Sequence, residues 1–104
     1  LKGLELGCSG IITATCNVTS QLSRKVYDDF LAGKDQTYNQ KLCDVRNTFE
    51  KYNLISGLHT FYSKKSQIYK NVLPPLSILN SKDEQELTND LNNLGFSIKS
   101  LMAA

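Results

Sequence analysis

Residues 6–18 read Leu6-Gly7-Cys8-Ser9-Gly10-Ile11-Ile12-Thr13-Ala14-Thr15-Cys16-Asn17-Val18, a turn of small residues followed by a short apolar, β-branched run. A run of this kind, with glycines before it and a helix after it, is typical of a fully buried parallel strand. A parallel strand needs neighbours on both sides, and no other segment of the chain has this pattern. We therefore expect one strand of a sheet whose other strands are missing from these residues.

The composition is that of an ordinary globular protein. The chain has 104 residues, of which 40% are hydrophobic and 21% charged, and this length predicts a single domain. The net charge of +2 is small and the signs are interspersed, so a nucleic-acid partner is not expected. No apolar segment is long enough to span a bilayer and no secretory signal is visible, which predicts a cytoplasmic protein without a membrane partner. Since the chain opens at Leu1, we also expect that the start of a longer protein is not represented.

The cysteines do not indicate a metal centre. Cys8, Cys16 and Cys43 are odd in number and lack metal-ligand spacing, so we expect free, partly buried thiols and neither a metal nor a cofactor. Cys16 has no adjacent base in sequence and is interpreted as a small buried hydrophobic residue rather than a nucleophile. The glycosylation sequon at residues 17–19 carries little weight as a single short match.

Four amphipathic helices follow the expected strand. The first begins at Thr19 or Ser20 and runs to about residue 32, with Gly33 as its left-handed stop. The second begins near Asp35, and the third covers residues 54 to about 64, with a packing reason expected for Gly57. The apolar stripe of the second helix consists of Tyr38, Leu42, Val45, Phe49 and Tyr52, with Asn53 marking a helix end.

A proline-containing loop and a final helix complete the pattern. Residues 71–80 contain Pro74 and Pro75 and should run extended over a surface. Ser81 and Glu84 then predict a capping box that starts a helix ending at Gly95. This last helix should bury Leu87, Leu91 and Leu94, Phe96 and Ile98 should pack back, and the tail from Lys99 should fray.

In this order, the segments resemble the C-terminal part of the dihydrodipicolinate synthase / N-acetylneuraminate lyase family. These are class I aldolases built on a (β/α)8 barrel with added C-terminal helices. The residues that look like the eighth barrel strand of the family are Gly7, Gly10, Ile11, Ile12, Thr15, Asn17 and Val18. Gly33-Lys34 with Asp35, and Leu73-Pro74 before the last helix, add support. The resemblance covers nearly the whole chain and implies a mainly α fold: the last strand (residues 1–18 with its turn) and a helical extension (residues 19–104).

The resemblance also implies a chemistry. Family members bind pyruvate or another 2-keto acid as a Schiff base on a lysine of the sixth strand, and a tyrosine of the fifth strand moves protons. Both positions would precede Leu1, so no catalytic residue is assigned here. The resemblance places the Ile12 carbonyl close to the Schiff-base lysine, with Thr13 and Ala14 facing the pocket. Ala14 argues mildly against a sialic-acid pocket, because similar sialic-acid-cleaving members carry a hydroxyl residue there. An arginine often found before the proline loop is replaced by Val72.

The remaining candidates for chemistry have simpler interpretations. His59 has no carboxylate partner nearby in sequence and is expected at the surface or in packing. The lysines all fall at helix ends or on polar faces, whereas a Schiff-base lysine must be buried with a depressed pKa. The tyrosines are assigned to packing, and Asp83, Glu84 and Glu86 to a favourable first turn of a helix.

Two hypotheses follow from the sequence. The first is a C-terminal part of a pyruvate-type aldolase or lyase, inactive by itself. The second is a small helical bundle that acts as a binding or oligomerisation module. In either case the apolar face of the helix that contains Leu22 favours self-association, with residues 11–16 paired to another copy or recruited into helix.

Overall fold

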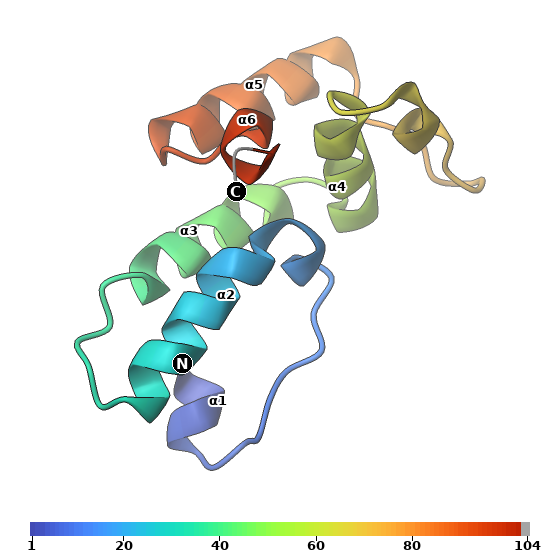
Figure 1. Cartoon of the computed structure of the whole chain (residues 1–104). Coiled ribbons are helices and arrows are strands. Elements are labelled where there is room, and N and C mark those ends of the chain that lie inside the picture. Colours follow the sequence, from blue (N-terminus) through green and yellow to red (C-terminus); the bar gives the residue numbers. More distant parts are fainter. Residues whose placement is uncertain (103–104) are drawn as a thin grey trace. The chain divides into compact units, whose positions relative to one another are not determined.

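The computed structural model describes residues 1–102, and every regular element among them is helical (Figure 1). The elements are α1 (Lys2–Glu5), α2 (Cys16–Leu31), α3 (Asn39–Glu50), α4 (Leu54–Ser63), the 3-10 helix η1 (Gln67–Lys70), α5 (Ser81–Asn93) and α6 (Ile98–Met102). The expected mainly α fold is therefore confirmed. The chain divides into two compact units, Leu1–Asp44 and Val45–Ala104. None of the helices in residues 1–102 combines the length and the apolar character needed to cross a membrane.

The strand expected at residues 11–16 is absent. Residues 8–13 are irregular, 14 and 15 form a turn, and α2 already begins at Cys16. A strand is stabilised by hydrogen bonds to a neighbouring strand, and residues 1–102 offer none. The carbonyls of Thr13 and Ala14 instead accept bonds from the N–H groups three residues further on, at 3.3 and 3.2 Å. Without a partner strand, this segment satisfies its backbone locally.

Helix α2 begins three residues earlier than the expected Thr19 and is broken at that residue. Thr19 has φ −115° and ψ 16°, outside the helical region, while its hydroxyl donates to the Thr15 carbonyl at 2.9 Å. At the other end Gly33 adopts φ 65°, and the Lys34 N–H bonds to the Asp29 carbonyl at 2.9 Å. This is a Schellman arrangement, and it confirms the expected glycine stop.

Helix α3 begins at Asn39, four residues after the expected Asp35. The Thr37 N–H bonds to the Asp35 carbonyl, and Gln36 Nε2 donates to the Val26 carbonyl of α2. These contacts hold residues 35–37 in a loop and delay the helix. The expected stripe is buried at its centre, where Val45 and Phe49 have no exposed surface. Its first residue, Tyr38, is 37% exposed and is not part of the core.

The second unit has an aromatic core between α4, α5 and the residues that flank them. Phe61 lies edge-on to Phe49 and is stacked on Phe96, with ring centroids 5.7 Å apart in both pairs. Leu87 and Leu91 of α5 are buried beside them, as expected, whereas Leu94 is only half-buried. Aromatic pairs at these separations stabilise a core beyond the area that they bury.

The starts of α4 and α5 correct two expectations. Asn53 does not end a helix; it caps α4, and its side chain accepts from the Ser56 N–H at 3.0 Å. The cap of α5 is Asn80, which accepts from the Asp83 N–H at 2.9 Å, so the expected Ser81–Glu84 capping box is wrong by one residue. Asparagine is among the best N-cap residues, and it precedes the serine.

The end of α5 follows the sequence prediction, and the tail does not. Gly95 adopts φ 67°, and the Phe96 N–H bonds to the Leu91 carbonyl at 2.9 Å, which brings Phe96 back onto the core. The expected fraying from Lys99 is replaced by α6 up to residue 102. Reciprocal bonds between Ser97 and Ser100 cap this short helix, and residues 103 and 104 lie outside the described part of the chain.

Candidate functional site

The segment before α2 holds the three predicted substrate-binding residues. Ile12 lies in the irregular part with its side chain fully exposed, at 106% of the reference area. Thr13 is half-buried, and Ala14 is exposed at the turn. The three residues therefore lie on an irregular segment that leads into the turn before α2, and not on a strand.

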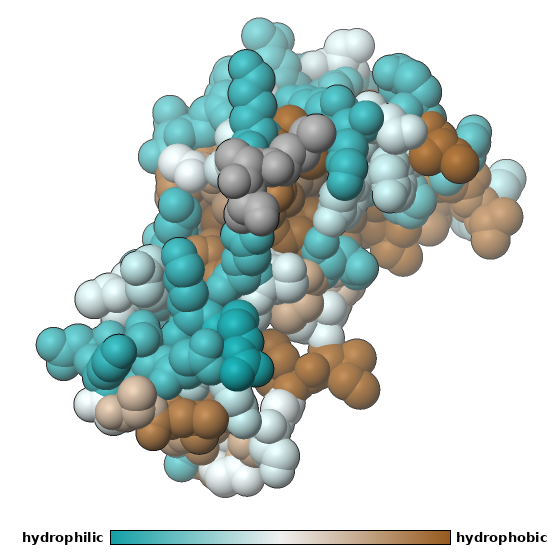
Figure 2. Space-filling view, in the orientation of Figure 1, coloured by the Kyte–Doolittle hydropathy of each residue, from teal (hydrophilic) through white to brown (hydrophobic). Residues whose placement is uncertain are grey.

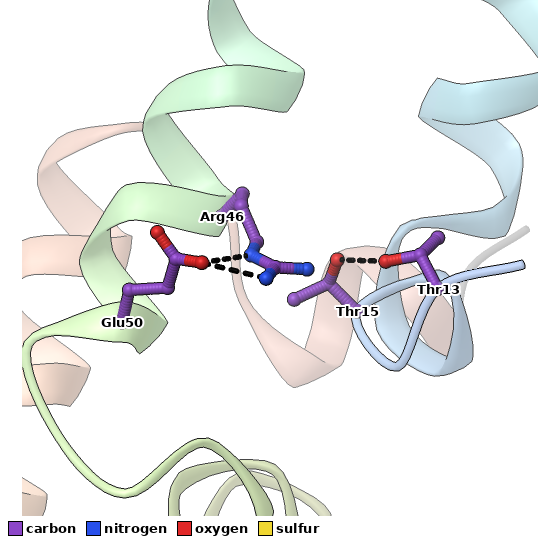
Figure 3. A network of polar contacts seen from close by, with 4 residues as sticks. All are labelled: Thr13, Thr15, Arg46 and Glu50. Atoms are coloured by element: carbon purple, nitrogen blue, oxygen red, sulfur yellow. Dashed lines mark hydrogen bonds and ion pairs between the residues drawn. The ribbon is translucent and has the colours of Figure 1, made fainter. Parts of the chain in front are cut away.

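Hydroxyl groups order this turn. Thr13 Oγ1 and Thr15 Oγ1 are 3.1 Å apart, as the close-up in Figure 3 shows. The Ala14 carbonyl accepts from Asn17 Nδ2 at 2.9 Å, and Thr15 and Thr19 are almost completely buried. The segment can offer hydroxyl and carbonyl groups to a ligand, but Ile12, Thr13 and Ala14 include no group that could act as an acid or base.

Figure 3 also draws Arg46 and Glu50, an ion pair one turn apart on α3. Arg46 Nη2 is 2.6 Å and Arg46 Nε 2.7 Å from the same carboxylate oxygen of Glu50. Both side chains are more than a third exposed, so water screens the attraction. This pair supports the exposed face of α3 and is not a catalytic arrangement.

A second concentration of polar groups lies in the second unit. A groove of about 440 Å³ is lined by Lys51, Tyr52, Asn53, Ser56, Ser77, Ile78, Leu79, Asn80 and Asp83. Both N-cap asparagines, Asn53 and Asn80, contribute to its wall, so the starts of α4 and α5 meet there. Sequence reasoning missed this groove, because its lining comes from two stretches, residues 51–56 and 77–83, that are far apart in sequence. The two asparagines before apolar helical patterns were the only available signal.

Charges on α5 act on this groove. Lys51 Nζ donates to Asp90 Oδ2 at 3.0 Å, and this hydrogen bond together with the negative charge raises the pKa of Lys51. Burial raises the pKa of Tyr52, and the carboxylates of Glu86, Asp90 and Asp83 raise it further. A raised pKa keeps Lys51 protonated, which is opposite to what a nucleophilic lysine requires.

The first unit contains a smaller apolar cavity of about 200 Å³. Its walls include Leu4 of α1, Gly10 and Ile11 of the segment before α2, and Val26 of α2. Ser23 and Tyr27 also line it, and the Ser23 hydroxyl is 3.3 Å from Cys16 Sγ. Within the apolar run, Ile11 lines this cavity, whereas Ile12 is fully exposed.

The other candidates take structural roles. His59 Nδ1 lies 2.8 Å from the Tyr69 carbonyl, and since a carbonyl only accepts, this nitrogen carries the proton. His59 thus holds η1 to α4, as expected for a packing residue. The three cysteines are free, although Cys8 and Cys43 are exposed and only Cys16 is partly buried. Within residues 1–102 no three acidic, histidine or cysteine side chains gather in a way that could hold a metal ion.

The described part of the chain is thus helical, and the segment with the predicted binding residues Ile12, Thr13 and Ala14 contains no acid–base pair. A family model for the dihydrodipicolinate synthetase family matches residues 1–94. The chain belongs to this family, whose parent fold is a (β/α)8 barrel and whose members are lyase-like. The comparison with curated proteins returned no match, and the comparison with solved structures returned none either. The resemblance seen in the sequence is therefore confirmed.

Proposed function

We propose that this chain is the C-terminal part of a lyase that binds pyruvate or another 2-keto acid as a Schiff base. The family match over residues 1–94 carries this proposal. In the assembled enzyme, residues 11–16 form the last barrel strand. The Ile12 carbonyl, Thr13 and Ala14 then form the floor of the substrate pocket. The chain itself supplies binding surface and no catalytic residue.

The lysines support the absence of a nucleophile from this chain. Every lysine is exposed except Lys41, which is half-buried, and the hydrogen bond to Asp90 raises the pKa of Lys51. A Schiff-base lysine must be neutral to attack a carbonyl, so it needs burial or a neighbouring cation to lower its pKa. Solvated ammonium groups do not meet this requirement. The proposal therefore assigns the nucleophile to a sequence upstream of Leu1.

Pyruvate trapping with borohydride tests the proposal. Reduction converts a Schiff base into a stable amine, so a lysine that binds pyruvate gains a fixed mass. We expect no adduct on residues 1–104 alone. We expect a single adduct on a sixth-strand lysine when the upstream coding sequence is expressed together with them. A stoichiometric adduct on any lysine of this chain, or an upstream sequence without a lysine-bearing sixth strand, contradicts the proposal.

A second candidate function is a helical module that associates with itself. The observation that favours it is the aromatic core of the second unit, which Phe49, Phe61 and Phe96 close without any sheet. Large apolar side chains remain outside this core, among them Ile11, Ile12 and Leu73, which are 67%, 106% and 83% exposed. Exposed apolar groups of this size favour association. Light scattering after size exclusion tests this candidate, and a clean monomer at micromolar concentration contradicts it.

A further inference from the structure

The strongest unassigned feature is the projecting loop that follows α4, here called the basic tip and defined as residues 67–76. Figure 1 shows this loop extending away from α4, and Figure 2 shows apolar surface, in brown, at its end. Leu73 is 83% and Ile68 68% exposed, and Pro74 and Pro75 follow directly. Large apolar side chains at the end of a projecting loop are typical of a contact surface.

The basic tip is held in place at both ends. Tyr69 stacks on Tyr62 of α4, with ring centroids 5.1 Å apart, and its carbonyl accepts from His59. Beyond the prolines, the Leu79 N–H donates to Thr60 Oγ1 at 2.9 Å. Both ends of the loop are therefore anchored to α4, which reduces the conformational freedom that a contact would remove.

Charge is distributed unevenly around the basic tip. The basic tip contains Lys70 and no aspartate or glutamate, and Lys64 and Lys65 precede it in the sequence. Lys65 and Lys70 are exposed beside the apolar residues, whereas the ammonium group of Lys64 already donates to Thr88 of α5. The partner of the basic tip must therefore combine apolar and acidic groups.

The second unit carries such a surface itself. The groove of about 440 Å³ includes the half-buried side chains of Ile78 and Leu79 and the carboxylate of Asp83. Glu86, one turn further along α5, is exposed and acts electrostatically on Tyr52 at the groove wall. Lys51, itself part of the groove wall, is paired with Asp90, so Asp83 of the wall and Glu86 beside it are the carboxylates that this lysine does not pair with.

We propose that the groove of one copy receives the basic tip of a second copy, with Leu73 against Ile78 and Leu79, and Lys70 facing Glu86. Each copy carries both a tip and a groove in the unit that begins at Val45, so each of two copies can place its tip in the groove of the other. A second copy is favoured over an anionic membrane because the complementary acidic and apolar surface is present in this chain. The inference rests on the self-association of the second candidate function and names its surface.

Two charge reversals test the exchange. In K70E the altered tip meets the Glu86 carboxylate, and in E86K the Lys70 ammonium meets a new lysine, so both variants repel themselves. We expect each to weaken self-association by about ten-fold or more in Kd. Mixing K70E with E86K restores opposite charges at both contacts, so the mixture should associate as the wild type does. Sedimentation velocity over a concentration series measures all four samples.

Two further variants complete the design. Leu73→Ser removes the apolar contact without changing charge and should also weaken association. Lys34→Glu makes the same charge change as K70E at an exposed position in the first unit and should leave association unchanged. Far-UV circular dichroism of every variant checks that the helices are retained.

Each alternative outcome is distinct. Two results overturn the exchange of tips: none of the variants alters self-association, or the mixture of K70E and E86K stays dissociated. Both results leave the second candidate function in place. A wild-type chain that is monomeric overturns both. A further result also overturns the inference: the wild type does not self-associate but sediments with phosphatidylserine-containing vesicles, whereas Leu73→Ser does not. This result would assign the basic tip to membrane binding. None of these results affects the lyase proposal, which pyruvate trapping tests separately.

Discussion

Gly57 of α4 lies directly against the ring of Phe49: a Cβ atom built on Gly57 would be 3.4 Å from Phe49 Cδ1. Gly57 is buried, and its φ is not in the left-handed region, so the glycine is explained by close packing rather than by backbone conformation. The same Cβ would be 4.0 Å from Leu87 Cδ2. The packing reason expected from the sequence is therefore confirmed.

This contact predicts opposite effects for small and large substitutions. Gly57→Ala places a methyl group in van der Waals contact and removes the helix penalty of glycine, so the free energy of unfolding should stay the same or rise by up to about 1 kcal/mol. Gly57→Leu forces a branched side chain into the Phe49 ring and should cost about 1–3 kcal/mol. Urea unfolding followed by circular dichroism measures both. A large loss for the alanine variant would show that the packing is tighter than 3.4 Å indicates.

The cap of α5 gives a second prediction. Asn80→Ala removes the acceptor of the Asp83 N–H and should lower the free energy of unfolding by about 1 kcal/mol. Ser81→Ala is the matched control and should change it by less than about 0.5 kcal/mol, because the serine is an exposed first residue of the helix. If Ser81→Ala were the more damaging of the two, the capping box expected from the sequence would be correct after all.

The third prediction concerns alkaline pH. The pKa values of Lys51, Tyr52 and Tyr62 are all raised in the folded chain, the first mainly by Asp90 and the tyrosines mainly by burial. A group that holds its proton more tightly when folded stabilises the fold below its unfolded pKa, and this contribution is lost as the pH rises through the folded pKa. Stability should therefore fall above about pH 10.

Urea midpoints at pH 8, 10 and 11 check this dependence. In Tyr62→Phe the midpoint should fall less between pH 8 and pH 11, because the variant has no half-buried phenol to ionise. A wild-type midpoint that rises with pH in this range would have the wrong sign and would contradict the prediction.

A fourth prediction separates the exposed and buried residues of the segment before α2. Ile12→Ser should change the free energy of unfolding by less than about 0.5 kcal/mol, because the side chain is fully exposed. Thr15→Val keeps the shape of a buried side chain but removes the hydroxyl 3.1 Å from Thr13 Oγ1, and should cost about 1 kcal/mol. Thermal unfolding distinguishes them. Strong destabilisation by Ile12→Ser would indicate that Ile12 is covered in solution.

Much of the helical pattern could be predicted from the sequence, because the signals that define it are local. Gly33 and Gly95 end their helices in left-handed conformation, as the residues before them indicate, and the buried positions Val45 and Phe49 follow from helical spacing. The cap of α5 was predicted one residue late, because adjacent Asn80 and Ser81 are both good caps and only the contact with Asp83 distinguishes them.

Two features of the structure could not be predicted from local sequence signals. The run Ile11-Ile12-Thr13 has the composition of a strand, but a strand exists only where partner backbone is present, and the described residues provide none. The groove beside Tyr52 depends on two stretches, residues 51–56 and 77–83, that meet in space, so no spacing in the sequence reveals it. The family, in contrast, follows from the order of many weak local motifs, which the match over residues 1–94 confirms.

The break at Thr19 gives α2 two separable parts. Residues 16–18 form a single turn before the kink at Thr19, and the longer part of the helix follows it. If a neighbouring strand paired with residues 11–16, only this one turn would have to unwind. Val26 and the Schellman ending at Gly33 would remain as they are. Thr19 would then mark the boundary between the one turn that a paired strand replaces and the helix that both arrangements keep.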